Sequence, residues 1–346
     1  MGRPVRYGGE FGGFQERANH MADIAASALA PISIEDSEQF QRYIKRVPHG
    51  VVLVIAPWNY PYMTAINAVA PALIAGNVVL LKHATQTLLV GERLARAFHV
   101  AGVPEAVFQN LYLDHATTAQ LIADKSFGFV NFTGSVQGGR AIEQAAAGSF
   151  TGLGLELGGK DPGYVMDDAD IQAAAETLID GAMFNSGQCC CGIERIYVAE
   201  AVFDQFVEIA VAIVNSYQLG NPLDSDTSLG PMAHARFAAL VRAQTDDAIS
   251  RGAKALIDPA RFPANKGAYL MPQILLDVDH SMPVMQEESF GPVVGIMKVR
   301  NDAEAIALMN DSQYGLTGAL WTPDLDRATH IADQLDTGTV FMNRCD

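Results

Sequence analysis

The chain has 346 residues, 49% of them apolar and 18% charged, which is typical of a soluble globular protein long enough for two domains. Its formal net charge of -16 argues against nucleic acid or a membrane surface as a partner, and no apolar run is long enough to span a bilayer. No secretory signal peptide is evident, and three of the four cysteines are consecutive, so we expect a cytoplasmic protein.

Short apolar runs alternate with helical patterns through the first half of the chain. The predicted strands are residues 51–56, 78–81, 108–113 and 128–132, and the predicted helices are residues 67–75, 88–100 and 140–147. Apolar strands separated by helices indicate a parallel sheet covered on both faces, which binds ligands at the carboxyl ends of its strands. Asn59, Lys82 and residues 133–135 are predicted at those ends. Residues 27–47 break the alternation and predict a hairpin or arm.

A second alternation begins near residue 160, and we place the break between the halves at Gly158-Gly159. Three aspartates near residue 170 are placed to cap a helix that runs to about Gly187. Further helices are predicted for residues 202–217, 302–310 and 324–335, and strands for residues 193–199, 269–278, 292–299, 316–322 and 338–342. The expected fold class is therefore α/β in both halves.

The run Cys189-Cys190-Cys191 is the most informative local feature. Adjacent cysteines rarely reach disulfide geometry, and structural zinc needs spaced ligands, so we expect neither a disulfide nor a metal site. The remaining chemical interpretation is a thiol nucleophile, and the alternative is three small buried apolar residues. A helix C-terminus disfavours a thiolate, so we expect the thiol to be activated by a base or a cationic cofactor.

Two other segments present polar groups in constrained settings. In an extended chain, Glu156 faces away from Leu155 and Leu157 and is flanked by glycines, which suits a general base in a partly desolvated gap. A surface glutamate between turns is the alternative. Asn59 lies between Pro57 and Pro61, and an amide held in this way can donate to a developing oxyanion. A rigid loop around a buried tryptophan would have the same sequence.

Two weaker signals point to a bound anion or sugar. Residues 132–139, which include Gly134 and Ser135, follow a strand and open a helix, as anion sites do, although a glycine-rich turn is equally consistent. They do not form the G-x-G-x-x-G dinucleotide motif. Residues 287–292 place Glu288 and Phe290 before a strand, where the carboxylate either accepts from ribose hydroxyls or belongs to a solvated turn.

Taken together, these segments resemble the aldehyde dehydrogenase superfamily along the whole chain. LELGGK (residues 155–160) and GQCC (residues 187–190) are highly specific as a pair, and PWNYP, FTGS and EESFGPV agree with them. The resemblance implies a Rossmann-like NAD(P)-binding domain (residues 1–26 and 48–158), an oligomerisation arm (residues 27–47) and a catalytic α/β domain (residues 159–346). It also implies a homo-oligomer, a dimer or a tetramer.

The resemblance assigns roles by position. Cys190 matches the nucleophile, Glu156 the general base and Asn59 the oxyanion donor. The positions that match cofactor contacts are Trp58, Lys82, Thr85, Gly134, Ser135, Glu288 and Phe290. The implied reaction oxidises an aldehyde to the carboxylic acid with NAD or NADP through a thiohemiacetal and a thioester on Cys190.

The sequence departs from the family pattern in three respects, one of which is that the glycine-rich turn has Gly138 as well as Gly139. Lys82 is followed by His83-Ala84-Thr85, where many NAD-preferring relatives carry a glutamate at the last position. A neutral Thr85 does not repel a 2′-phosphate, and the pattern is most similar to the succinate-semialdehyde dehydrogenases. Family members also begin before Met1 and continue beyond Asp346, so we expect a chain truncated at both ends. A non-catalytic fragment or structural relative, and a cofactor-independent thiol hydrolase, are the alternative functions.

Overall fold

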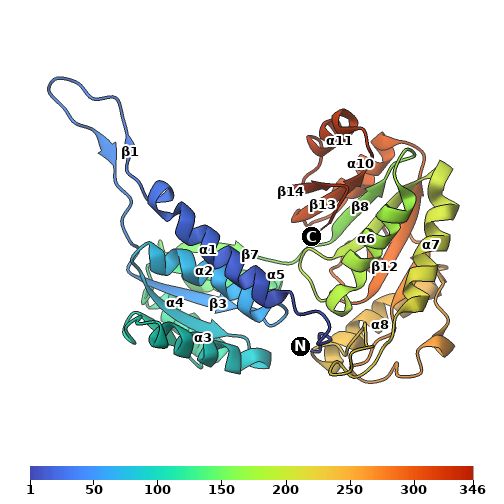
Figure 1. The fold of residues 1–346 in the computed structure, drawn as a ribbon, viewed down its shortest axis with the longest axis horizontal. Helices are drawn as coiled ribbons and strands as arrows, with labels where there is room; N and C mark the ends of the chain where they lie inside the picture. The colour runs from blue at the N-terminus through green and yellow to red at the C-terminus, as the bar shows by residue number, and fades with distance from the viewer. Residues whose placement is uncertain (346) are drawn as a thin grey trace. The chain divides into compact units, whose positions relative to one another are not determined.

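The computed structural model describes residues 1–345 (Figure 1). The chain forms two compact units: an N-terminal unit, Gly8–Leu157, and a C-terminal unit that combines Met1–Tyr7 with the chain from Gly158 onward. Each unit contains a mainly parallel sheet with helices on both faces, so the predicted α/β class is confirmed. No helix in the described part of the chain is long and apolar enough to cross a membrane.

The N-terminal unit is built on a five-stranded parallel sheet with the strand order β5-β4-β3-β6-β7. Its strands are β3 (Val51–Ala56), β4 (Val78–His83), β5 (Phe108–Asn110), β6 (Phe129–Thr133) and β7 (Gly152–Glu156). Side chains of β3 alternate between two apolar clusters: Val52 and Val54 pack on one face, and Leu53 and Ile55 on the other. This period of two explains why the run reads as continuously apolar in the sequence.

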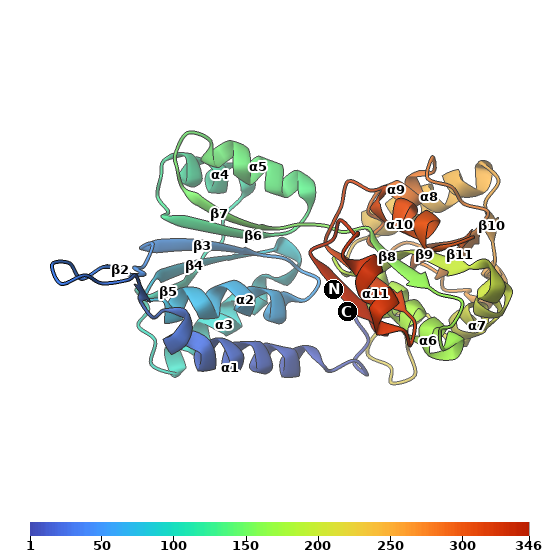
Figure 2. The ribbon, with the colours of Figure 1, turned by 90° about the horizontal axis from the view of Figure 1, so that it is seen from above.

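Five α-helices cover this sheet: α1 (Glu10–Ala28), α2 (Pro61–Ile74), α3 (Leu88–Val100), α4 (His115–Ala123) and α5 (Val136–Ala146). Helices α1, α2 and α3 lie on one face, and α4 and α5 lie on the other (Figure 2). The carboxylate of Glu10 accepts from the backbone N–H of Tyr62 at 2.7 Å, so α1 satisfies a donor at the beginning of α2. Helix α2 begins directly after the Asn59 loop.

Residues 27–47, predicted as a hairpin or arm, contain a two-stranded antiparallel ribbon. Strand β1 (Ile32–Ser33) pairs with β2 (Tyr43–Ile44). The ribbon carries exposed apolar side chains, among them Phe40 with 66% of its surface exposed. A two-stranded ribbon is marginal by itself in water, because each apolar side chain gains little burial.

The C-terminal unit is built on a seven-stranded sheet with the order β10-β11-β12-β9-β8-β13-β14, in which only the edge strand β10 runs antiparallel. Its strands are β8 (Asp161–Val165), β9 (Ile193–Ala199), β10 (Lys254–Ala255), β11 (Gln273–Leu276), β12 (Val293–Val299), β13 (Thr317–Trp321) and β14 (Thr339–Met342). The central strands β8 and β9 are buried along their whole length.

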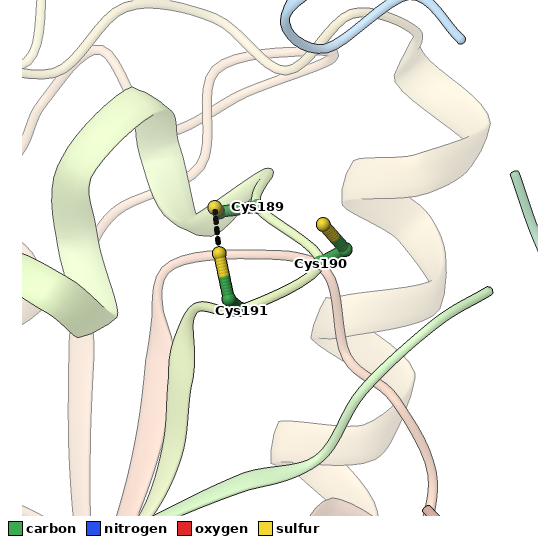
Figure 3. A group of neighbouring side chains, drawn as sticks. All are labelled: Cys189, Cys190 and Cys191. Atoms are coloured by element: carbon green, nitrogen blue, oxygen red, sulfur yellow. Dashed lines mark hydrogen bonds between the residues drawn. The ribbon is translucent and has the colours of Figure 1, made fainter. Parts of the chain in front are cut away.

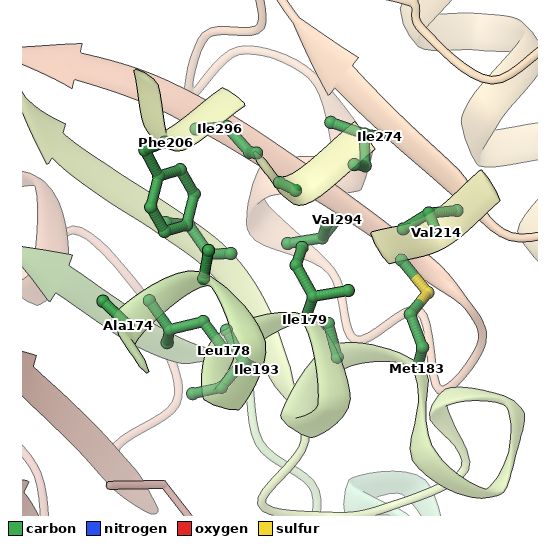
Figure 4. Packing of buried hydrophobic residues seen from close by; sticks show 14 of the residues in the cluster. Ala174, Leu178, Ile179, Met183, Ile193, Phe206, Val214, Ile274, Val294 and Ile296 are labelled. Atoms are coloured by element: carbon green, nitrogen blue, oxygen red, sulfur yellow. The ribbon is translucent and has the colours of Figure 1, made fainter. Parts of the chain in front are cut away.

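The helices of this unit are α6 (Ile171–Met183), α7 (Phe203–Ser216), α8 (Ala235–Ser250), α9 (Pro283–Gln286), α10 (Asp302–Asn310) and α11 (Leu325–Ala332). Helices α6 and α7 pack on one face of the sheet and form the largest core cluster, in which Leu178 and Phe206 meet Ile296 of β12 (Figure 4). Helices α10 and α11 pack on the opposite face against Tyr164 and Tyr197. The side chain of Asp170 caps α6 by accepting from the N–H of Ala173, in agreement with the expected cap.

Candidate active site

The candidate residues of the N-terminal unit lie along the carboxyl edge of its sheet. Asn59 follows β3, Lys82 is the penultimate residue of β4 opposite Ile55, and Glu156 ends β7 opposite Thr133. The sequence predicted Lys82 just past the end of its strand, whereas the structure places it within β4, one residue before the strand ends. The order of the strands therefore brings candidate residues from three segments to one edge.

A buried histidine fastens the Asn59 loop to the sheet. Asn59 is 4% exposed, and His83 is 2% exposed. His83 donates from Nε2 to the carbonyl of Pro61 at 3.0 Å, while its Nδ1 accepts from the Ala84 N–H and the Thr87 hydroxyl. Burial lowers the pKa of His83, which keeps the ring neutral and consistent with this tautomer. In the sequence, His83 shows only as a departure from the family pattern, and this role was not predicted.

Lys82 offers a cationic group that the protein does not neutralise. Its side chain is 5% exposed, and burial lowers the pKa of its ammonium group. Within residues 1–345 no carboxylate forms an ion pair with it. Thr85, three residues further, is exposed at the beginning of a short 3₁₀ turn. A buried, unpaired ammonium group is costly unless a ligand satisfies it, so this edge fits a polar or anionic group.

The beginning of helix α5 forms a second anion-compatible feature. Ser135 is its N-cap, and the Ser135 hydroxyl accepts from the N–H of Gly138 at 3.1 Å. A β-carbon at Gly134 would lie 2.7 Å from the ring of Phe132, so a side chain there would disturb the turn. The N-terminus of this eleven-residue helix carries the partial positive charge that favours a phosphate group.

Glu156 is exposed at the end of β7. The sequence predicted that its side chain would point away from Leu155 and Leu157 into a partly desolvated gap. The extended backbone agrees with the strand expected there, but the N-terminal unit by itself does not desolvate the carboxylate.

The cysteine run follows a left-handed turn rather than a helix end. Helix α6 ends at Met183, and the next turn contains Asn185 (φ 52°), Ser186 (φ 56°) and Gly187 (φ 69°). Left-handed conformations are costly for non-glycine residues, so surrounding contacts must hold them. The Ser186 hydroxyl donates to the carbonyl of Gly230, and Gln188 accepts from the N–H of Ala233. The cysteines are therefore held by a strained and well-anchored turn.

The three thiols lie close together, and hydrogen bonds among them favour a thiolate within the group. Hydrogen bonds from the Cys189 and Cys191 thiols, together with backbone N–H groups, lower the pKa of Cys190. Hydrogen bonding to Cys190 raises the pKa of Cys189, and hydrogen bonding to Cys189 raises that of Cys191. Activation by a base or a cofactor was expected from the sequence, and the neighbouring thiols are a further, local source.

Glu288 and Phe290 lie beside the cysteine loop in the same unit. The N–H of Gly159 donates to the Glu288 carboxylate at 3.1 Å. A β-carbon at Gly158 would collide with that carboxylate, and one at Gly159 would collide with the carbonyl of Cys190. Burial raises the pKa of Glu288 to about 7. The two glycines of LELGGK therefore allow Glu288 and the Cys190 loop to approach the same stretch of backbone.

A network of buried charged side chains next to this loop was not predicted from the sequence. Lys160 and Glu194 form an ion pair at 2.5 Å, with side chains 0% and 5% exposed. Glu194 also accepts from the N–H groups of Ser289 and Phe290, both at 2.8 Å. Arg195, 1% exposed, donates to the carbonyl of Lys160 and to carbonyls at the end of α10. Glu194 and Arg195 occupy an otherwise apolar strand, and that interruption was the available signal.

Comparison with known proteins identifies the family. The aldehyde dehydrogenase family model matches residues 9–346. The chain is 37% identical to the succinate-semialdehyde dehydrogenase [NADP(+)] of Deinococcus radiodurans, covering 94% of this chain and 68% of that protein. It is 38% identical to the 4,4'-diapolycopene aldehyde oxidase of a Methylomonas species, covering 95% of this chain and 60% of that protein.

A solved structure agrees with this assignment. The succinic semialdehyde dehydrogenase of Streptococcus pyogenes, in complex with NADP+, superimposes with a TM-score of 0.91 at 31% identity, covering 98% of this chain and 74% of that one. The chain belongs to the aldehyde dehydrogenase family, whose members oxidise aldehydes with NAD(P)+. It spans about two thirds of the length of the two relatives above.

Proposed function

We propose that this chain carries the catalytic apparatus for oxidising an aldehyde to its carboxylic acid, with Cys190 as the nucleophile. The supporting observation is the anchored left-handed turn that carries the thiol run, with the carbonyl of Cys190 against Gly159 and the Glu288 carboxylate bonded to the N–H of the same glycine. A structural role alone requires no thiol at this position. Family membership supports the reaction class.

In this proposal the Cys190 thiolate attacks the aldehyde carbon and forms a thiohemiacetal, which is oxidised to a thioester. The amide of Asn59 and the backbone N–H of Cys190 donate to the developing oxyanion. Glu156 then removes a proton from the water that hydrolyses the thioester. Glu156 precedes Gly159 by three residues, and Gly159 lies against the carbonyl of Cys190.

The cofactor residues fit a dinucleotide by their chemistry. Bound NAD(P)+ supplies the hydride acceptor. Lys82 presents an unpaired ammonium group to ribose hydroxyls, and the beginning of α5 at Gly134 and Ser135 presents backbone N–H groups to a pyrophosphate. Trp58 directly precedes Asn59 in the loop after β3, and Thr85 follows Lys82 by three residues. Glu288 and Phe290 are proposed to contact the nicotinamide ribose and ring.

A semialdehyde acid is the proposed substrate class. Two of the proteins compared above bear the name succinate-semialdehyde dehydrogenase, and the Lys-His-Ala-Thr pattern pointed the same way. Arg344, whose guanidinium lies 5.1 Å from the ring of Phe341, is exposed and is our candidate for binding the distal carboxylate. Comparing succinic semialdehyde with neutral aliphatic and aromatic aldehydes tests this choice.

We also propose that the arm formed by residues 27–47 mediates homo-oligomerisation, and that the protein is cytoplasmic. The exposed apolar side chains of the ribbon, such as Phe40 and Tyr43, support a buried position in an assembly. Light scattering on the purified chain and on Phe40→Glu tests the assembly. An unchanged oligomer in the variant would remove the arm from that role.

The activity is tested with purified protein, the aldehyde panel and either NAD+ or NADP+, by following reduced nicotinamide. Cys190→Ala should abolish oxidation, whereas Cys189→Ala and Cys191→Ala should retain much of it. Equal losses from all three variants would mean that Cys190 is the wrong thiol. Glu156→Gln should slow thioester hydrolysis, so that a burst of reduced cofactor precedes a slow steady state.

The alternatives give different results in the same experiment. Ester hydrolysis that ignores the added cofactor would favour a thiol hydrolase. No turnover with any aldehyde, while full-length relatives are active under the same conditions, would favour a non-catalytic fragment or structural relative.

A further inference from the structure

The three sulfur atoms of the cysteine run converge, although the residues are adjacent in sequence. The Sγ atoms of Cys189, Cys190 and Cys191 all lie within 4.8 Å of one another. The Sγ atoms of Cys189 and Cys191 are 3.4 Å apart, and both lie on the same side of the loop (Figure 3). All three residues are only partly buried, so a small ion can reach them from solvent.

The turn before the cysteines explains this convergence. Consecutive residues of an extended chain point to opposite sides, which is why the sequence argued against a metal site. The left-handed residues 185–187 reverse the chain, and the N–H of Gly192 then bonds back to the carbonyl of Cys189 at 3.2 Å. The buried side chain of Gln188 fixes the turn by donating to the carbonyl of Asn185. The thiols are thus held together before any ligand arrives.

The separation of the sulfur atoms matches a thiophilic metal ion. A Zn–S bond of about 2.3 Å in tetrahedral geometry places two sulfurs about 3.8 Å apart. The observed separations, from 3.4 Å to at most 4.8 Å, bracket this value. Side-chain rotations that move the sulfur atoms by up to about 1 Å would complete a three-sulfur face. Thiolate ligands favour zinc and its softer analogues over magnesium or calcium.

We propose that Cys189, Cys190 and Cys191 form a three-thiolate site for Zn²⁺, with the fourth position of the ion open to water. The thiol protons are released to solvent when the metal–sulfur bonds form, and no electron is transferred. The formal net charge of -16 favours binding of a cation by this chain.

The consequence for catalysis rests on the proposed function. An ion bound to all three sulfurs occupies the lone pair with which Cys190 would attack an aldehyde. Zinc binding therefore converts the nucleophile into a ligand and inhibits the chain reversibly. Of the three sulfurs, only that of Cys190 attacks the aldehyde in the proposed reaction, whereas tight zinc binding requires Cys189 and Cys191 as well, so the two properties can be separated by mutation.

The site is tested by titrating the fully reduced chain, freed of reductant, with Zn²⁺, and by using Cd²⁺ for its sulfur-to-metal ultraviolet absorption. We expect one ion per chain, and a loss of affinity of at least about tenfold in each of Cys189→Ser, Cys190→Ser and Cys191→Ser. The matched control is Cys345→Ser, because Cys345 lies outside the group and donates to the carbonyl of Thr177. The control should bind as tightly as the wild type. Unchanged binding in Cys189→Ser and Cys191→Ser would overturn the proposal.

A second measurement needs neither a variant nor enzymatic activity. Stoichiometric Zn²⁺ should slow the alkylation of residues 189–191 by iodoacetamide, read by peptide mass spectrometry, while Cys345 reacts at the same rate with and without zinc. Removing the ion with a chelator should restore the rate. Equal alkylation with and without Zn²⁺ would refute the site even if the chain proves to be an active dehydrogenase. Protection in an inactive chain would support it independently of the proposed function.

Discussion

Replacing Lys160 by methionine tests whether the buried network supports the candidate active site. The substitution removes an ammonium group whose side chain is fully buried and leaves the carboxylate of Glu194 without its counter-ion. Removing one partner of a buried ion pair lowers the free energy of unfolding by about 3–5 kcal/mol. Glu194 keeps two backbone donors at 2.8 Å, so we expect the lower end, about 3 kcal/mol. For a unit of this size, that corresponds to a fall in Tm of roughly 6–12 °C.

The assay can be restricted to the C-terminal unit. The chain has two tryptophans, and Trp321 is 2% exposed in the core of that unit, whereas Trp58 belongs to the other. In a Trp58→Phe background, fluorescence during urea unfolding reports the C-terminal unit alone. Lys254→Met is the matched control, because Lys254 forms an exposed ion pair with Asp277. That control should change the unfolding midpoint little.

A double-mutant cycle with Glu194→Gln identifies the cause. If the unpaired charge is responsible, Lys160→Met together with Glu194→Gln should cost less than the sum of the single substitutions, by about 1–3 kcal/mol. Strict additivity, or a Lys160→Met effect no larger than that of the surface control, would refute this reasoning. Because Glu194 holds the N–H of Phe290, Lys160→Met should also raise the KM for the cofactor more than it lowers kcat.

Two further predictions concern the end of β4 and the turn after it. Because burial lowers the pKa of His83 in the folded chain, the unfolded chain binds a proton on this ring more readily as the pH falls below about 6.5. The free energy of unfolding therefore decreases over that pH range. The stability advantage of the wild type over His83→Gln should therefore be larger at pH 7.5 than at pH 5.5 in urea unfolding, and an equal difference at both would contradict the neutral buried ring. Thr85→Glu should raise the KM for NADP+ relative to that for NAD+, because the new carboxylate repels the 2′-phosphate by about 1–4 kcal/mol. Steady-state kinetics with both cofactors measures the ratio of the two KM values, and an unchanged ratio would contradict this prediction.

Much of the fold could be predicted from the sequence because its strands are short and continuously apolar. Strand β3 has the predicted bounds, and α10 was predicted residue for residue. Helices α1 and α8 were not predicted. Helix α1 has no buried residue, and α8 buries only three, so neither shows the apolar stripe from which a helix is recognised. Strand β8 was also missed, because it opens with Asp161 and Pro162, which are rare in strands.

In the candidate site, too, the positions of some residues could be predicted from the sequence and those of others could not. Asn59, Lys82 and Ser135 could be placed from the sequence because each lies next to the end of an apolar strand, and the carboxyl ends of parallel strands share one edge. The convergence of the three thiols could not be inferred in this way. It depends on left-handed backbone at Asn185 and Ser186, which neither residue type requires and only the surrounding contacts impose.

The same reasoning explains why the most specific motif of the chain contains residues with no chemical role. In LELGGK, Glu156 is the proposed base, but Gly158 and Gly159 leave room for the Glu288 carboxylate and the carbonyl of Cys190. Lys160 anchors the carboxylate of Glu194, which in turn holds the backbone before Phe290. Such a segment is fixed by what packs against it from three other parts of the chain. A pattern is therefore recognisable in the sequence even where the physical reason for each residue becomes visible only in the folded unit.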